Sequence, residues 1–554
     1  MIRRYFKSER GMATLIALIM VGMLTLIGLA ALSTSDDEMS IAGNELQEMR
    51  AFYGAEAGLE AAAAAIQAQY TATGLPPTTL PSGTYDINNC HVVYRTVDNG
   101  APAHQVLSYG TMVGLHAMVK SFTVTADATS TVEPARIRLT QAFEAAFIPI
   151  YQFAVFYNRD LEIAPGPLMS LIGRVHSNGN LYIQSGNTLN MDSYVTAAGD
   201  ILHGRKGPGT VDKGDILIKD PLGNYENMKT GGSTWLDASD PNWFDASTAR
   251  WGGRVQDAGH GQQKLAVPLS SSSDPHALIE PAGGGNIDSY ENKASLKCID
   301  GTWYKDMGGV WQDITANMIA AGAISGASDK FYDSRENVGV DVVDLDMQKL
   351  YASGLAPTNG VIYYSQKILG GTANDYPALR LVNGDSLWAP LTLASANPVY
   401  TLGDFNSDVK KPAAILADAL TFLSANFDDN KTNPAFGWTQ SDRPATATTV
   451  NVSYVAGNVE TDSTNYNGGF ENLARFLEDW GGVAMNWKGS AVCLWNSVQA
   501  DGIWNQTYYT APNRNWLYDT DLDDPANMPP GTPLVRVFIR SGWRQEHVGY
   551  ESTS

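Results

Sequence analysis

An uncharged stretch near the N-terminus limits what this chain can fold into more than any other feature. Residues 12–32 contain no charged side chain, and all but two threonines among them are apolar or glycine. A helix of about 20 residues, rising about 1.5 Å per residue, matches the hydrocarbon thickness of a bilayer. Basic residues dominate before the stretch and acidic residues follow it: Arg3, Arg4, Lys7 and Arg10, against Glu9, then Asp36, Asp37 and Glu38. This asymmetry predicts a single-pass inner-membrane protein with a cytoplasmic N-terminus and its bulk on the far side.

Three interpretations of residues 12–32 are open. A secretory signal peptide is disfavoured, because the stretch is long for one and residues 30–33 make a poor cleavage site. A plain transmembrane anchor is the simplest interpretation. In the third, a short basic leader ends at Gly11, is removed before Met12, and leaves the apolar stretch at the start of the mature protein.

Helical signals continue beyond the apolar stretch. Residues 33–65 carry apolar side chains at helical spacing and many alanines, which favour helix. The sequence therefore predicts one long helix over residues 12–69, of which residues 12–32 cross the membrane. Helices in lipid associate through small residues that let their backbones approach closely. The candidates for such packing are Ala13, Ala17, Gly22 and Gly28.

Three segments of this region resemble the PilX-type N-terminal region of type IV pilus minor pilins. They are the junction Arg10-Gly11-Met12, residues 42–44 (Ala-Gly-Asn) and residues 51–59 (Ala-Phe-Tyr-Gly-Ala-Glu-Ala-Gly-Leu). The resemblance implies that residues 1–11 are a prepilin-type leader, which prepilin peptidase removes between Gly11 and Met12 before methylating the new amino group of Met12. It also implies other pilin subunits as partners of the helix, and a tip adhesin as a further partner.

One position departs from the pattern of major pilins. They carry Glu at the fifth mature position, which is Ile16 here, and PilX-type and general-secretion K-type minor subunits often lack that Glu as well. The resemblance therefore implies an initiating or tip location rather than repeated use along a fibre.

The net charge of −21 limits the function classes. Loss of residues 1–11, with four basic side chains and one acidic, would make it −24. Such an acidic chain excludes nucleic acid as an expected partner, because phosphate binding needs clustered Lys and Arg. Two of Cys90, Cys298 and Cys493 could pair in an oxidising compartment, but the sequence does not say which two.

Beyond the helix, the sequence reads as mainly β. A breaker-rich linker at residues 75–83 leads into strand-like runs, which define a small β module over residues 70–150. A large β-rich domain is predicted over residues 151–554. Its strongest pattern is a 20-residue repeat in which Val175, Gly179 and Leu181 correspond to Val195, Gly199 and Ile201. This spacing favours β-solenoid rungs, with an ordinary β-meander as the alternative.

Residues 203–335 lose this periodicity and are predicted to be a large loop-rich insertion, ordered in part by scattered tryptophans. Strand-like runs return later and are expected to extend the stack that begins at residue 171. Two helices are predicted among them, at residues 413–425 and 471–480. The expected fold class is thus mainly β with a long N-terminal helix, its outer part β-solenoid-like.

No catalytic motif is recognisable, so we do not expect an enzyme. His176, in the turn of a predicted rung, is expected to be structural. Glu471, Arg475 and Asp479, four residues apart on the second predicted helix, are expected to form a salt-bridged ladder. The densest acidic segment places Asp519, Asp521 and Asp523 on a loop. Alternate carboxylates of this kind can bind Ca²⁺, although a solvated acidic loop is the default expectation.

These patterns favour a minor pilin or pilin-like protein, anchored in the inner membrane, that serves in assembly, priming or tip decoration of a type IV pilus. The first alternative is a membrane-anchored surface protein whose β domain binds glycan or a protein partner. The second is an anchored carbohydrate-active enzyme.

Overall fold

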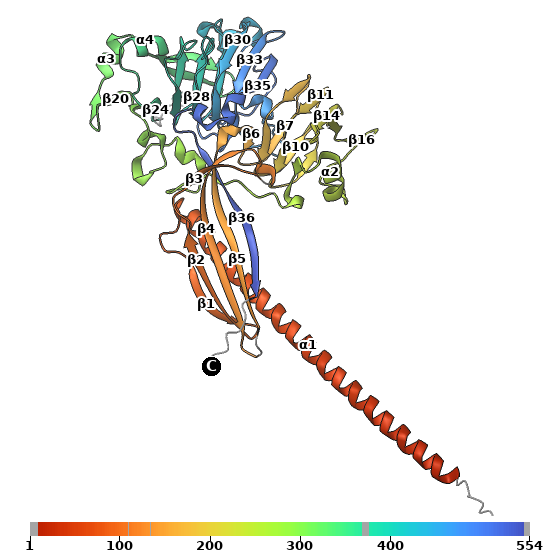
Figure 1. Cartoon of the computed structure of the whole chain (residues 1–554). Coiled ribbons are helices and arrows are strands. Elements are labelled where there is room, and N and C mark those ends of the chain that lie inside the picture. Colours follow the sequence, from red (N-terminus) through yellow and green to blue (C-terminus); the bar gives the residue numbers. More distant parts are fainter. Residues whose placement is uncertain (1–8, 109, 133–134, 368–375, 548–554) are drawn as a thin grey trace, which may run out of the picture. The chain divides into compact units, whose positions relative to one another are not determined.

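The structure, a computed structural model, describes residues 9–108, 110–132, 135–367 and 376–547, which form a long N-terminal helix followed by mostly β structure (Figure 1). The chain divides into two compact units. The first comprises residues 1–101, 120–144 and 538–554, and the second comprises residues 102–119 and 145–537. The chain therefore passes between the units four times, and three of these passages lie within a strand.

A single 65-residue helix, α1 (Glu9–Thr73), opens the first unit. It ends where Gly74 adopts a left-handed φ of 68° and donates its N–H to the carbonyl of Tyr70. Glycine tolerates this conformation without a Cβ clash, and two prolines follow at once, so the helix cannot continue. The predicted helix over residues 12–69 is confirmed.

The sheet of the first unit has the strand order β1-β2-β4-β5-β36, and β3 pairs with β4. Its strands are β1 (Ser82–Ile87), β2 (Cys90–Asp98), β3 (Ala103–Val106), β4 (His116–Ser130), β5 (Arg136–Pro149) and β36 (Leu534–His547). Of these, β4, β5 and β36 extend into the second unit. Sequence patterns place β36 in the large domain, whereas the structure pairs this last strand with β5.

One face of the second half of α1 is buried in the first unit. Its buried side chains recur every three or four residues: Ala51, Ala55, Leu59, Ala62, Ile66 and Tyr70. Gly54 and Gly58 lie at the closest approach, where an added Cβ would meet Val92 and Ala126 or Ala128. The last strand adds Phe538, whose ring lies 5.7 Å from that of Tyr70, and Arg540, which pairs with Glu60.

The second unit begins with parallel strands stacked at a 20-residue spacing. Val155 pairs with Val175 and Val175 with Val195, while Leu161 pairs with Leu181 and Leu181 with Ile201. All six side chains are buried. The strands are β6 (Phe153–Tyr157), β7 (Leu161–Ile163), β8 (Met169–Leu171), β9 (Arg174–Ser177), β10 (Leu181–Ile183), β11 (Thr188–Met191), β12 (Val195–Ala197), β13 (Ile201–His203) and β14 (Asp215–Lys219). The predicted repeat register is confirmed, and the solenoid interpretation stays a prediction.

Later strands join the same stack, as predicted. Parallel pairing runs from β24 through β26, β28, β31 and β34 to β6, so that Ala491 lies beside Val155. The bounds are β22 (Ile324–Asp333), β23 (Val338–Asp346), β24 (Val361–Ser365), β25 (Pro377–Val382), β26 (Leu391–Ser395), β27 (Val399–Leu402), β28 (Ala413–Ala417), β29 (Leu420–Leu423), β30 (Thr448–Asn451), β31 (Ser453–Ala456), β32 (Ala474–Arg475), β33 (Ala484–Gly489), β34 (Ala491–Cys493) and β35 (Asn513–Tyr518), with α4 (Met347–Ala352). β22, β23, β25, β27, β29 and β32 form a second sheet, and β30, β33 and β35 form a third.

Residues 203–335 are more ordered than an inserted loop. They contain β15 (Tyr225–Asn227), β16 (Lys229–Gly231), β17 (Thr234–Trp235), β18 (Val255–Gln256), β19 (Leu296–Ile299), β20 (Thr302–Asp306), β21 (Trp311–Asp313), α2 (Trp243–Trp251) and α3 (Thr315–Ala320). Strand β19 pairs in parallel with β24. It therefore belongs to the same sheet as β24 and β6, which has twelve strands within the described residues. Trp251 and Trp303 are buried, in keeping with the ordering role expected for the tryptophans.

The two helices predicted in the last third are wrong. Residues 413–417 and 420–423 are the parallel strands β28 and β29, and every side chain in both is buried. Strands buried on both faces are apolar throughout, so their composition resembles that of a buried helix. Residues 470–472 form one 3₁₀ turn, and β32 follows at Ala474–Arg475. There the pairing of β32 with β29 prevails over local helix propensity.

Candidate functional site

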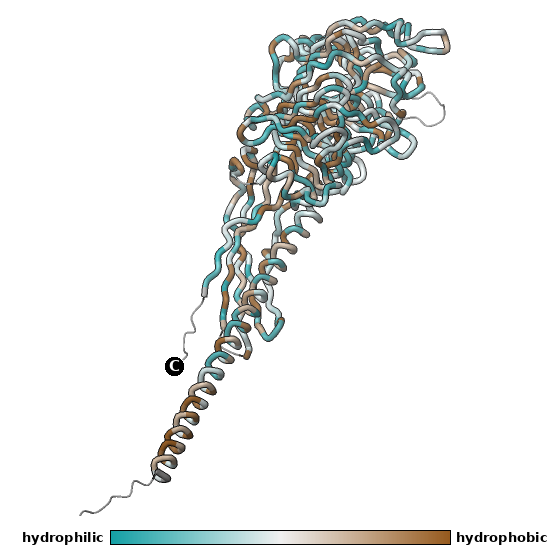
Figure 2. The backbone as a smooth tube through the Cα atoms, turned by 90° about the vertical axis from the view of Figure 1, so that its right-hand side faces the viewer, coloured by the Kyte–Doolittle hydropathy of each residue, from teal (hydrophilic) through white to brown (hydrophobic). Residues whose placement is uncertain are grey.

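The start of α1 is apolar over residues 12–32 and uncovered. Residues 11–42 are all exposed, including Leu18 at 71% and Leu26 at 68%. Figure 2 shows that hydrophobic residues predominate at the start of this helix. Within the described ranges it is the one helix long and apolar enough to cross a membrane. So large an exposed apolar surface requires lipid or other apolar helices to cover it.

The predicted packing residues do not share one side of the helix. At 3.6 residues per turn, Ala17 and Gly28 lie on the same side as Ala13, and Gly22 lies about half a turn away. No heavy atom comes within 4 Å of a Cβ built at Gly22 or at Gly28. The helix therefore offers small-residue surfaces on two opposite sides, which suits contact with more than one neighbouring helix.

The predicted processing residues also lie on this helix. Gly11 and Met12 are within α1, and Met12 is 63% exposed. Ile16 is exposed as well, and no carboxylate lies between it and Asp36. This part of the helix thus has no acidic partner to offer to a neighbour's N-terminal amine.

The acidic loop at residues 519–524 is held by cations of the protein. Lys410 bonds both Asp519 and Asp521, and Lys488 lies 3.1 Å from Asp519. Asp523 instead accepts a hydrogen bond of 2.9 Å from the hydroxyl of Tyr518. Across the part of the chain that the structure describes, no three His, Cys, Asp or Glu side chains gather as metal ligands. This arrangement does not support Ca²⁺ binding by Asp519, Asp521 and Asp523. Binding of Ca²⁺ there stays a prediction.

The predicted ladder of Glu471, Arg475 and Asp479 is wrong, because no helix brings the three together. Arg475 is buried and pairs with Glu336 from the β22–β23 turn, while its second terminal nitrogen donates to the carbonyl of Ala500 at 2.6 Å. Glu471 accepts from the backbone N–H of Ala164 at 2.9 Å, and burial raises its pKa to about 7. Sequence spacing carries no signal for partners 139 residues apart.

His176 is a satisfied, buried side chain. Its ring nitrogens lie 2.8 Å from the hydroxyl of Thr196 and 3.0 Å from the side-chain oxygen of Asn178. Burial lowers its pKa to about 4, so the ring stays neutral at physiological pH. This arrangement agrees with the structural role expected for it. The three cysteines are buried and free, so the pairing that the sequence left open is not present.

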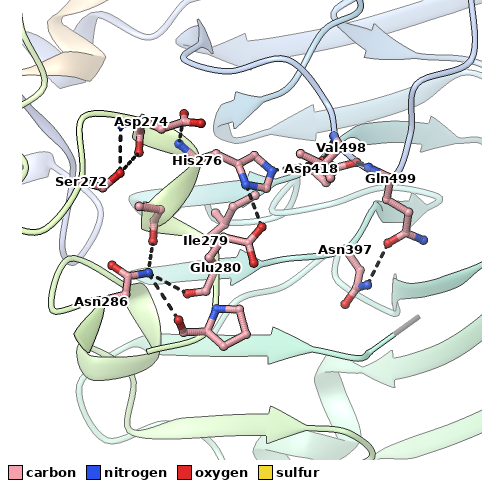
Figure 3. Close-up of polar contacts among 12 residues, drawn as sticks. Ser272, Asp274, His276, Ile279, Glu280, Asn286, Asn397, Asp418, Val498 and Gln499 are labelled. Carbon is pink, nitrogen blue, oxygen red and sulfur yellow. Dashed lines mark hydrogen bonds and ion pairs between the residues drawn. The ribbon is translucent and has the colours of Figure 1, made fainter. Parts of the chain in front are cut away.

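Sequence patterns do not reveal a charged cluster around His276, which Figure 3 shows between two carboxylates. Its Nδ1 lies 2.9 Å from Glu280, and its Nε2 lies 3.3 Å from Asp418. Asp418 is fully buried and also accepts from the backbone N–H groups of Val498, Gln499 and Ala500. Burial alone would lower the pKa of His276, but the two carboxylates outweigh it and raise that pKa to about 9.

This pKa leads to a pH prediction. A histidine with a raised folded-state pKa stabilises fully below its unfolded pKa of about 6.5, and this contribution is lost as the pH rises through 9. We expect His276 to contribute roughly 2–3 kcal/mol that disappears between pH 6.5 and 9. Urea unfolding at pH 6.5, 7.5 and 9 measures it. The difference between wild type and His276→Asn should shrink across that range, and a constant difference would contradict the assignment.

Comparison with known proteins places the chain in no family. No protein-family model matches it, and no curated protein matches it. Among solved structures, the crystal structure of the competence-associated pilin ComZ from Thermus thermophilus aligns with 91% of this chain and 98% of its own, at 11% identity and a TM-score of 0.29.

Proposed function

We propose that this protein is a pilin-like subunit, anchored in the inner membrane by residues 12–32, that joins a type IV pilus or a related fibre through α1. One observation carries the proposal: a single helix has two environments. Residues 12–32 are apolar and exposed on all sides, and the second half of the helix buries one face, from Ala51 to Tyr70, against a sheet. A helix of this kind suits a subunit that passes from lipid into a bundle of like helices.

Within this proposal the subunit is a minor one. Ile16 stands where major pilins carry Glu, so each copy lacks the carboxylate that would meet a neighbour's N-terminal amine. The second unit is also large for a subunit repeated along a fibre, since it holds residues 145–537. We therefore propose a priming or tip location, with other pilin subunits, and a tip adhesin, as partners. The role is one of assembly, without catalysis.

The processing step gives the decisive experiment. We expect the protein from the cell envelope to begin at a methylated Met12, and Gly11→Val to remain as a precursor that is longer by residues 1–11. Intact mass spectrometry and N-terminal sequencing measure both. Gly22→Val, which makes the same substitution within the apolar stretch, is the matched control and should be processed normally.

Two outcomes would contradict the proposal. Gly11→Val protein of mature size would show that cleavage does not depend on this junction. A wild-type N-terminus downstream of Leu32 would mean that the apolar stretch is an export signal, removed from the mature protein.

A further inference from the structure

A polar pocket of about 560 Å³ opens in the second unit between the β22–β23 hairpin and residues 429–436. Hydrogen bonds fix its two walls to each other. The backbone N–H of Tyr332 donates to the hydroxyl of Thr432 at 2.8 Å, and that hydroxyl donates to the carbonyl of Asp429 at 3.0 Å. The two walls are therefore joined through the side-chain hydroxyl of Thr432.

An irregular hairpin supplies the first wall. Between the pairs Ala327–Val342 and Phe331–Val340, β22 has more residues than β23, which leaves Asp329 in a left-handed conformation at φ 46°. Bulges of this kind redirect side chains and occur near functional sites. The carboxylate of Asp329 lies over Gly339, where an added Cβ would come within 2.1 Å of it.

The other end of the hairpin presents an amide. Asn337 has φ 57°, and its side-chain oxygen accepts a 2.8 Å hydrogen bond from the hydroxyl of Tyr332. This bond orients the amide and leaves its NH₂ group directed elsewhere. An asparagine amide has two N–H donors and one acceptor oxygen, so the bond from Tyr332 to the oxygen positions the NH₂ group as the donor.

The second wall adds another amide and an aromatic ring. Asn433 uses its side-chain oxygen to accept from the N–H of Ala435 at 2.9 Å, which starts the turn Pro434–Phe436. That turn displays Phe436 with 78% of its surface exposed. The lining of the polar pocket thus includes one apolar ring face that a ligand could cover.

The charges at the pocket exclude other ligand classes. Asp429 is bonded by Arg380 at 2.7 Å and lies 3.6 Å from Lys330, so both cations are already matched by a carboxylate. Asp329 adds a further negative charge, which disfavours anions such as phosphate or uronate. The polar lining disfavours a purely apolar ligand. A neutral molecule with many hydroxyls and one apolar face suits this lining.

We propose that this pocket binds a neutral saccharide. The apolar face of one sugar ring lies on Phe436, and its hydroxyls bond to the amides of Asn337 and Asn433 and to the carboxylate of Asp329. Amides and carboxylates suit hydroxyls because each offers paired sites for donors or acceptors. The inference is independent of the pilin proposal, since it depends only on the second unit.

A binding experiment on the full-length protein tests the inference. The protein is held in lauryldimethylamine oxide micelles, because a maltoside detergent would compete for the site. The probes are immobilised neutral oligosaccharides (N-acetylchito-, cello-, malto- and galacto-oligosaccharides), with sialylated and uronate-containing ones for comparison. We expect at least one neutral series to bind, and Phe436→Ala and Asn337→Ala each to weaken its binding about tenfold.

Leu222→Ala is the matched control, because Leu222 is 86% exposed and is not part of the pocket. It should leave binding unchanged, and melting temperatures should show that all variants fold. Tyr332→Phe, which removes only the hydroxyl that orients Asn337, should weaken binding less than Asn337→Ala does. Absence of binding to every neutral series, binding only to acidic glycans, or equal binding by Phe436→Ala would each overturn the inference.

Discussion

Replacing Arg475 by methionine is expected to lower the free energy of unfolding of the second unit by about 3–5 kcal/mol, because it leaves the carboxylate of Glu336 buried without its partner. Both side chains of this pair are about 3% exposed. The substitution also removes the donor to the carbonyl of Ala500, which connects β32 to the last part of the second unit. Urea unfolding followed by tryptophan fluorescence measures the loss.

Two controls separate this pair from general effects of charge. The double variant Arg475→Met with Glu336→Met should recover much of the lost stability, since neither charge then remains buried. Lys367→Met breaks the exposed pair with Asp300 and should change stability by less than about 1 kcal/mol. If Arg475→Met cost no more than Lys367→Met, the buried pair would have no special role in stability.

Replacing Gly58 by leucine is expected to detach α1 from its sheet. A Cβ at this position would already lie 2.9 Å from the Cβ of Ala126 and 3.2 Å from Val92, so a longer side chain has no room. Overpacking of a tight contact costs about 1–3 kcal/mol, and here the neighbours belong to strands that cannot shift independently. Limited proteolysis and hydrogen exchange of β2 and β4 should show the loss of protection.

Gly43 provides the control for helix propensity. It is in the same helix, and nothing lies within 4 Å of its added Cβ. Gly43→Ala should therefore stabilise the helix by up to about 1 kcal/mol, the ordinary gain of alanine over glycine. Gly58→Ala should stabilise the protein less than Gly43→Ala does, because its added Cβ comes too close to the Cβ of Ala126. Equal protection of β2 in Gly58→Leu and wild type would disprove the packing argument.

Local patterns predicted the helix and the 20-residue register well, because both depend on nearest-neighbour chemistry. The charge-free stretch before Asp36 and the alanines after Arg50 each favour helix on their own, and α1 contains both. Val175 and Val195 pair as the repeat requires, since identical spacing puts equivalent side chains in register.

Long-range partners explain what could not be predicted. Glu336 and Arg475 are 139 residues apart, and His276 and Asp418 are 142 apart, so no window of sequence contains both members of either pair. The helix predicted at residues 413–425 was wrong for another reason. Parallel strands that are buried on both faces lose the alternation of apolar and polar residues that identifies a strand. Asp418 lies at the corner between β28 and β29, and the local sequence does not reveal its hydrogen bonds to the loop at residues 498–500.

The four passages of the chain between the units have a mechanical consequence. Because β4, β5 and β36 each begin in one unit and end in the other, paired strands join the two units in addition to the loop at residues 99–102. A single cut in that loop would break the covalent path from α1 to the second unit, but it would leave these strands paired. Release of the second unit from α1 would therefore require unfolding of the first unit's sheet even after such a cut.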